Sequence, residues 1–186
     1  MTQIEEFDEA LERSWRNGVK KDVQAVTRYY GFHEVDLVNS LYYHLRNRLT
    51  KSGIWKNIQV EAFGIFFVTK KRKEVQPDML IYKTHGYKPW VAFEFKRFEG
   101  TPQRARIDAD IVKLAHLKEK EKITRAYMVW VASRKPERRQ IKQNTHSKKV
   151  DKILKEAKYL KICYGFFEEE DWGILDFPFK TYPYPL

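Results

Sequence analysis

The feature that most constrains the fold is an uninterrupted apolar run from Ala126 to Ala132. The run has no charged residue and is too short for a typical helix, so it indicates a β-strand that is buried on both faces. Strands of this kind lie inside sheets whose two faces are packed with helices. The run therefore predicts an α/β fold in which helices flank a mixed central sheet.

The periodicity of apolar residues along the rest of the chain supports this fold class. Apolar residues at three- and four-residue steps predict helices over 4–29, 33–50, 103–121 and 147–158, with a break in the first at Asn17-Gly18. Stretches of β-branched and aromatic residues predict strands over 58–68, 78–83, 90–96, 126–132 and 160–167. The first three strands can form an antiparallel meander, and the strand that follows the 103–121 helix is expected to lie parallel to a neighbour.

A chain of 186 residues can bury a core as one domain. We expect residues 1–186 to form a single domain in three parts. These parts are a helical extension over 1–30, a core over 33–132, and a basic helix, last strand and tail over 133–186.

The charge of the chain favours a polyanionic partner. Lys and Arg number 36 against 25 Asp and Glu, which gives a net charge of +11, and residues 134–161 hold eleven basic residues against three acidic ones. Such a surface can contact phosphates, although it can also be a solvated face that keeps the protein soluble. We expect nucleic acid as the partner, DNA rather than RNA, no membrane, and a possible homodimer.

Several functional classes are disfavoured by the composition. Cys163 is the one cysteine, which excludes an internal disulfide framework and a cysteine-based zinc cluster. The five histidines are scattered, and no Gly-x-x-x-x-Gly-Lys loop is present. Residues 1–12 carry five acidic residues and no Lys or Arg, unlike a secretory leader, and no apolar window is long enough for a membrane span. We expect a reduced, cytoplasmic protein.

Two charged residues interrupt the apolar strand predicted over 90–96. Alternate side chains share a face of a strand, so Trp90, Ala92, Glu94 and Lys96 are expected to point the same way, with the last two about 6.6 Å apart. Asp78 begins the preceding strand, and a hairpin brings it beside the end of the 90–96 strand. Two carboxylates at one sheet edge suit a hard divalent cation such as Mg²⁺, for which Mn²⁺ can substitute.

This arrangement resembles the PD-(D/E)xK nuclease superfamily, which has the restriction-endonuclease-like fold. The motif residues are Pro77-Asp78 and Glu94-x-Lys96, and the predicted elements follow the family's αβββαβ core order. The resemblance implies a metal-dependent phosphodiesterase in which Asp78 and Glu94 bind Mg²⁺ and Lys96 serves the attacking water. The Gln-x-x-x-Tyr helix signature of RecB-like exonucleases is absent, because Gln103 is followed four places later by Ile107.

The family often adds an acidic residue from its first core helix. Glu34 matches that place, with Asp36 and Glu61 as alternatives, and Asp110 and Lys113 resemble polar positions on the second core helix of some members. An ordinary helix-terminal charge is an equal reading of Glu34. The residues that we expect to contact nucleic acid, some of which can instead be exposed salt partners, are Arg97, Arg104, Arg106, Lys113, Arg138, Arg139 and Lys142.

The sequence thus predicts a Mg²⁺-dependent endonuclease acting on DNA. Two alternatives remain open: a catalytically inactive nucleic-acid-binding domain of the same fold, and a non-enzymatic interaction protein.

Overall fold

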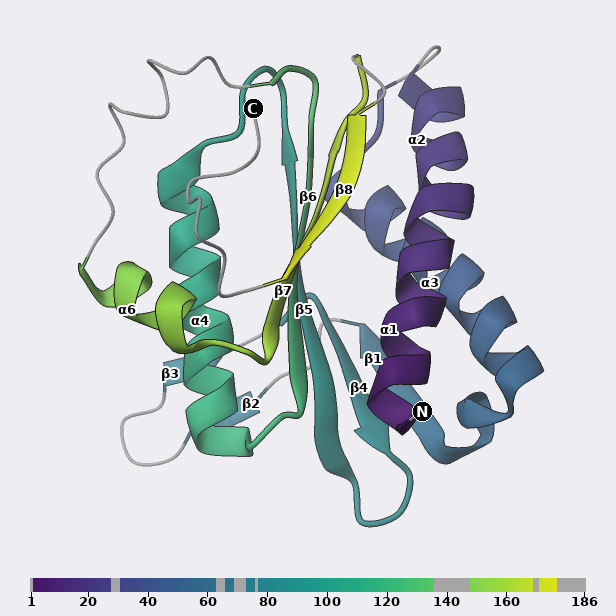
Figure 1. Ribbon diagram of the computed structural model, residues 1–186, viewed down its shortest axis with the longest axis vertical. Helices are drawn as coiled ribbons and strands as arrows, with labels where there is room; N and C mark the ends of the chain where they lie inside the picture. The colour runs from purple at the N-terminus through teal and green to yellow at the C-terminus, as the bar shows by residue number, and fades with distance from the viewer. Residues whose placement is uncertain are drawn as a thin grey trace.

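A computed structural model describes residues 2–27, 31–62, 66–68, 73–75, 77–135, 148–168 and 171–176. Figure 1 shows a central twisted sheet with one layer of helices on each face. The helices are α1 (Gln3–Ser14), a π-helical turn η1 (Trp15–Val19), α2 (Lys20–Thr27), α3 (Glu34–Ser52), a 3-10 turn η2 (Ile54–Asn57), α4 (Arg104–Glu121) and α6 (Lys148–Glu156). The strands are β1 (Ile58–Ala62), β2 (Phe66–Val68), β3 (Lys73–Val75), β4 (Met79–Lys83), β5 (Lys88–Phe98), β6 (Arg125–Ala132), β7 (Leu160–Phe166) and β8 (Asp171–Asp176).

The main sheet has six strands in the order β1-β4-β5-β6-β7-β8. The β1–β4 and β4–β5 pairs are antiparallel, the β5–β6 and β6–β7 pairs are parallel, and β8 closes the sheet antiparallel to β7. The predicted α/β class, the mixed sheet and the parallel placement of β6 after the α4 crossover are therefore confirmed. Residues 33–132 contain α3, β1, β4, β5, α4 and β6 in that order, with the small β2–β3 sheet between β1 and β4.

Each face of the sheet has its own core, and β6 contributes to both. Tyr127, Val129 and Val131 pack with the residues of α1, η1 and α3, whereas Met128 and Trp130 pack with those of α4 and α6. All of these β6 side chains are fully buried. This alternation is the physical reason for the uninterrupted apolar run. Among the described residues, no helix is long and apolar enough to cross a membrane.

One prediction about local structure was wrong, one strand was missed, and one prediction is confirmed. Residues 58–68 do not form one strand, because β1 pairs with β4 while β2 pairs with β3 in a separate two-stranded sheet. The acidic segment over 171–176, for which no strand was predicted, forms β8. The predicted division of the first helix at Asn17-Gly18 is confirmed, because α1 and α2 are separated by the π-helical turn η1, in which Gly18 lies against the ring of His44. A Cβ at position 18 would lie 2.3 Å from His44 Cγ, so only glycine fits this approach.

Trp90 does not share a face with Glu94, contrary to the prediction. Ile81 pairs with Val91 and Tyr82 pairs with Pro89, so Trp90 is an extra residue in a β-bulge. The bulge reverses its direction, and the Trp90 ring packs on Phe7 of α1, with ring centroids 5.2 Å apart. The residues that follow regain the regular alternation.

Candidate active site

The site lies where β5 extends beyond β4. The pairing of β4 with β5 ends at Met79 and Phe93, yet β5 continues to Phe98. We call residues Glu94–Phe98 the β5 overhang. One edge of the overhang pairs with β6, from Met128 to Ala132. The other edge has no β4 partner, so its backbone N–H groups need other acceptors.

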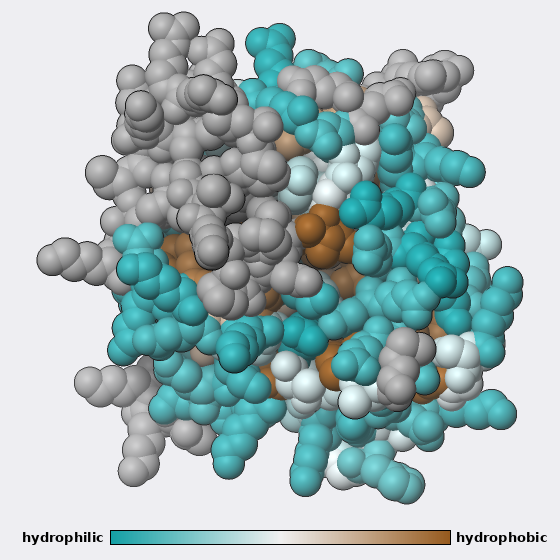
Figure 2. Space-filling model, in the orientation of Figure 1, coloured by the Kyte–Doolittle hydropathy of each residue, from teal (hydrophilic) through white to brown (hydrophobic). Residues whose placement is uncertain are grey.

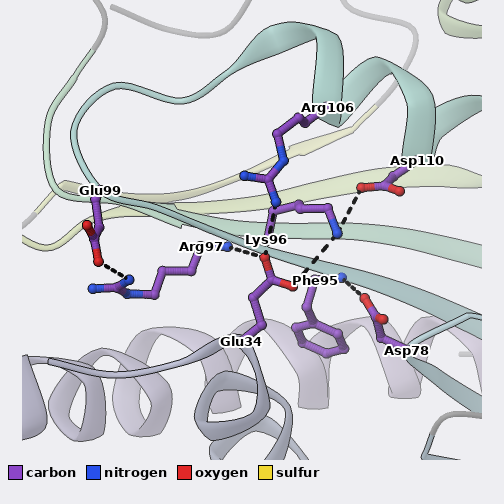
Figure 3. A network of polar contacts seen from close by, with 8 residues as sticks. All are labelled: Glu34, Asp78, Phe95, Lys96, Arg97, Glu99, Arg106 and Asp110. Atoms are coloured by element: carbon purple, nitrogen blue, oxygen red, sulfur yellow. Dashed lines mark hydrogen bonds and ion pairs between the residues drawn. The ribbon is translucent and has the colours of Figure 1, made fainter.

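Two carboxylates take the place of the missing strand. Asp78 Oδ2 accepts a hydrogen bond of 2.7 Å from the backbone N–H of Phe95, and Glu34 Oε1 accepts one of 3.2 Å from that of Arg97. Figure 3 shows Asp78 and Glu34 approaching the overhang from its open side. The unpaired edge of β5 therefore positions the predicted ligand Asp78 and the predicted helix acid Glu34.

Glu94 projects from the overhang toward α4 and is 0% exposed. Because Met79 pairs with Phe93, the position across from Glu94 is that of Asp78. Lys113 Nζ of α4 lies 2.7 Å from Glu94 Oε1 as an ion pair. Lys113 is therefore a direct polar partner of Glu94 Oε1, whereas Glu94 Oε2 has no hydrogen-bond partner among the described residues. Burial and the nearby Asp78 raise the pKa of Glu94 to about 9, although Lys113 opposes the shift.

Lys96 links the two helices that border the site. Its Nζ lies 3.3 Å from Asp110 Oδ2 of α4 and 3.8 Å from Glu34 Oε2 of α3 (Figure 3). Burial alone would lower the pKa of Lys96, but Asp110, Glu34 and Asp78 outweigh it and raise the pKa above its ordinary value. Lys96 is therefore a positively charged group at neutral pH.

Asp110 completes the ring of acids from the α4 side. It is mostly buried, and burial raises its pKa against the opposing effect of Lys96 and Lys113. The structure therefore brings together Glu34, Asp78, Glu94 and Lys96, all predicted as catalytic, with Asp110 and Lys113. We call these six residues the site cluster.

The alternatives to Glu34 do not reach the same position in the described structure. Asp36 Oδ2 accepts a hydrogen bond from the backbone N–H of His33 and caps the start of α3. Glu61 lies in β1 across from Leu80, and its side chain is outside the described residues. Glu34 is thus the α3 acid that contacts the overhang.

Two of the arginines predicted to contact nucleic acid lie beside the site. The guanidinium of Arg97 lies over the ring of Phe32 at 5.1 Å, and that of Arg106 lies over Phe98 at 5.5 Å. Arg106 also lies 3.8 Å from Glu34. The side chain of Arg104 and the residues Arg138, Arg139 and Lys142 lie outside the described residues, and their predicted role stays a prediction.

The donor set fits a divalent cation held by two carboxylates. In the described part of the chain, no group of three or more His, Cys, Asp or Glu is arranged around a common metal position. Mg²⁺ does not require such a group, because it commonly keeps several waters and takes one or two protein carboxylates. Glu94 Oε2, buried without a hydrogen bond from the described residues, is the donor that a cation near Asp78 would use first, since Oε1 already contacts Lys113.

The sequence motif did not predict that backbone N–H groups orient the acids of the site. The N–H groups of Phe95 and Arg97 orient two acids, and no side-chain motif reports on a backbone donor. The signal available in principle was the length of the strands, since β5 has eleven residues and β4 has five. The predicted ranges 90–96 and 78–83 concealed that difference.

In comparisons with known proteins, no family model, no curated protein and no solved structure matched this chain.

Proposed function

We propose that this protein is a Mg²⁺-dependent nuclease with a restriction-endonuclease-like core, and that it hydrolyses phosphodiester bonds of DNA, within the strand rather than from its ends. The observation that carries the proposal is the pair of acids Asp78 and Glu94 on neighbouring strands, with Lys96 two residues further along β5 and Glu94 Oε2 buried without a hydrogen bond from the described residues. Lys113 offsets part of the cost of burying Glu94, and a bound cation would offset more of it.

Each residue of the site cluster has a role in this proposal. Asp78 and Glu94 hold the cation, and Glu34 borders the same position from α3. Bound Mg²⁺ supplies a Lewis acid that polarises a phosphoryl oxygen and lowers the pKa of a nearby water. Lys96, kept protonated by Asp110 and Glu34, orients the attacking water and offers positive charge to the phosphate. Lys113 contacts Glu94 Oε1 and offsets part of the cost of its negative charge when Glu94 is ionised.

The stacked arginines support a polyanionic substrate. Arg97 and Arg106 flank Glu34, and the aromatic rings beneath them limit the freedom of their guanidinium groups. The guanidinium of Arg97 already pairs with the exposed Glu99 at 2.7 Å, so a phosphate backbone that enters the site would compete with Glu99 for Arg97 and with Glu34 for Arg106. The net charge of +11 favours the same class of substrate.

A cleavage panel tests the proposal. Supercoiled, linear, single-stranded and branched DNA, together with RNA, are incubated with the protein in Mg²⁺, Mn²⁺ or EDTA. We expect cleavage of DNA with either metal, none in EDTA, and loss of cleavage in Asp78→Asn. Asp151→Asn on α6 is the matched control, because it makes the same chemical change away from the site cluster. Full cleavage by Asp78→Asn, or no cleavage of any substrate with either metal, would contradict the proposal.

The second candidate function is a nucleic-acid-binding domain without catalysis. It is favoured by the two lysines that already pair with the acids, Lys113 with Glu94 and Lys96 with Asp110. Such a domain would bind DNA in EDTA, with an affinity that falls steeply with salt, and would cleave nothing. The same panel, combined with a binding measurement at two salt concentrations, separates the two candidates.

A further inference from the structure

The β4–β5 hairpin carries an exposed aromatic ring on a strained backbone. Lys83 pairs with Lys88, and the loop between them is Thr84-His85-Gly86-Tyr87. In Figure 1 this hairpin projects beyond the ends of the flanking helices. Tyr87 has φ +45° and its side chain is 69% exposed. A bulky residue in the left-handed region is unfavourable, and Asn or Gly usually occupies such positions.

The side chain of Tyr87 does not pack against the fold. It makes no ring contact or hydrogen bond with the described residues, and the ring faces solvent. The preceding residue of the turn, Gly86, also has a positive φ, of +83°, which glycine adopts without strain. The packing of the described residues therefore does not account for a tyrosine at this position.

The surroundings of the ring are positively charged. The stretch from Met79 to Phe93 contains no Asp or Glu, and Lys83 and Lys88 lie directly across from each other, an arrangement of like charges that is unfavourable by itself. The ammonium of Lys83 lies over the ring of Trp90, 5.1 Å from its centre. Exposed lysines of the neighbouring segments, Lys56 before β1 and Lys122 before β6, lie at the same end of the sheet, with Glu119 and Glu121 as acids on the last turn of α4. This end of the molecule is mostly hydrophilic on the face that Figure 2 displays.

We propose that the hairpin tip, Lys83–Lys88, is a second nucleic-acid contact, in which the ring of Tyr87 stacks on an unpaired base while Lys83 and Lys88 contact the adjoining phosphates. Stacking needs the face of a base that is free of its neighbour, so the partner is a single strand or a frayed end rather than continuous duplex. The tip lies about 20 Å from Glu94, six residues along β5 at the rise of a strand. The inference rests on the proposed function for its class of substrate and narrows it to DNA with unpaired bases near the cleaved bond.

Substitution at Tyr87 tests the inference without disturbing the fold. Binding of a fluorescent single-stranded oligothymidylate and of a blunt duplex is measured in EDTA, so that cleavage does not interfere. Tyr87→Asn should weaken binding of the single strand roughly five-fold or more, as expected for one lost stacking contact, and should change duplex binding little. Tyr87→Phe should retain the affinity. The control is Tyr43→Gln on α3, a tyrosine with 60% exposure, which should bind like the unaltered protein.

Asn tolerates the left-handed backbone, so Tyr87→Asn should melt at the same temperature as the unaltered protein or higher. Unchanged single-strand affinity in Tyr87→Asn, or an equal loss in Tyr43→Gln, would overturn the inference. Because binding is read in EDTA, the two proposals fail separately. If the unaltered protein cuts DNA and Tyr87→Asn binds the single strand normally, the hairpin contact alone is refuted. If the unaltered protein never cuts DNA and Tyr87→Asn loses affinity for the single strand, the nuclease alone is refuted.

Discussion

Two groups of partly buried charges in this molecule have opposite compositions. The first, which we call the anchor cluster, consists of Asp8 on α1 with Arg125, Tyr127 and Lys161 on the sheet. Asp8 Oδ2 lies 2.9 Å from Arg125 Nη2 and 3.2 Å from Lys161 Nζ, and Asp8 Oδ1 accepts a hydrogen bond from the Tyr127 hydroxyl. One acid thus faces three donors, and both of its oxygens have partners.

The site cluster has the reverse balance. The most deeply buried acid of the cluster, Glu94, contacts Lys113 through Oε1, and its Oε2 has no hydrogen-bond partner among the described residues.

The anchor cluster stabilises the fold, whereas the fold holds the acids of the site cluster close together at a cost in stability. The anchor cluster connects α1 to β6 and β7 and gives both oxygens of Asp8 a polar partner, as a stabilising network does. The site cluster concentrates acids at the cost of raising the pKa of Glu94 to about 9. An excess of buried acid is what a bound cation would neutralise, so the two clusters should respond in opposite ways to the loss of a carboxylate.

The largest expected effect is that of Glu94→Gln. We expect cleavage to fall by about a thousand-fold or more, equal to about 4 kcal/mol of transition-state stabilisation, because a neutral amide is a poor ligand for Mg²⁺. In EDTA at pH 8, the same variant should unfold at higher denaturant than the unaltered protein, because Gln resembles the protonated acid that burial favours. Plasmid cleavage and urea unfolding measure the two effects. Retained cleavage, or a loss of stability at pH 8, would remove the distinction between the clusters.

The next effect is that of Asp8→Asn in the anchor cluster, which should destabilise the protein by about 3 kcal/mol. The change leaves Arg125 and Lys161, both mostly buried, without their shared acid. Cleavage per folded molecule should stay unchanged. Urea unfolding measures the loss, and Asp151→Asn serves again as the control. If Asp8→Asn unfolds like the control, the anchor cluster does not hold α1 to the sheet.

Sequence periodicity predicted the helices and strands in which the order of apolar and polar residues follows from which face of the element is buried. The strand at Ala126–Ala132 and the helices near 34–52 and 104–121 were located within about two residues, because alternation and three- to four-residue steps reflect local packing. The strand β8 was missed because its identity depends on a distant partner. Trp172 covers Gly165 of β7, where a Cβ would lie 2.3 Å from the Trp172 ring, and no local pattern reports this fit.

The same limit applies to the site. Alternation along one strand predicted that Glu94 and Lys96 share a face, and the hairpin predicted that Asp78 lies near them, because both follow from neighbouring strands. The pairing of Lys113 with Glu94 could not be predicted, since it depends on how α4 crosses the sheet. The prediction for Trp90 failed for a related reason, since a single inserted residue reverses the alternation.

A smaller effect should appear in the pH dependence of stability. Between its ordinary pKa of 4.5 and about 9, Glu94 binds a proton in the folded state that the unfolded chain does not bind. The stability of the metal-free protein should therefore fall as pH rises from about 5 to 9, by at least the 1.4 kcal/mol that corresponds to one pKa unit. Glu94→Gln should lack this part of the slope. Urea unfolding at a series of pH values in EDTA compares the two proteins, and parallel curves would contradict a protonated Glu94.

The smallest expected effect distinguishes two arginines, Arg106 beside the site cluster and Arg125 in the anchor cluster. Arg106 is half exposed beside Glu34, so Arg106→Gln should leave the melting temperature unchanged, weaken DNA binding a few-fold and reduce the slope of affinity against salt by about one counterion. Arg125→Gln in the anchor cluster should lower the melting temperature and leave the salt slope as it is, because Arg125 is bonded to Asp8 and to the Lys158 carbonyl. Anisotropy at several salt concentrations and thermal melting test both variants. A changed salt slope in Arg125→Gln, with none in Arg106→Gln, would mean that nucleic acid approaches the α1 side of the sheet instead of the β5 overhang.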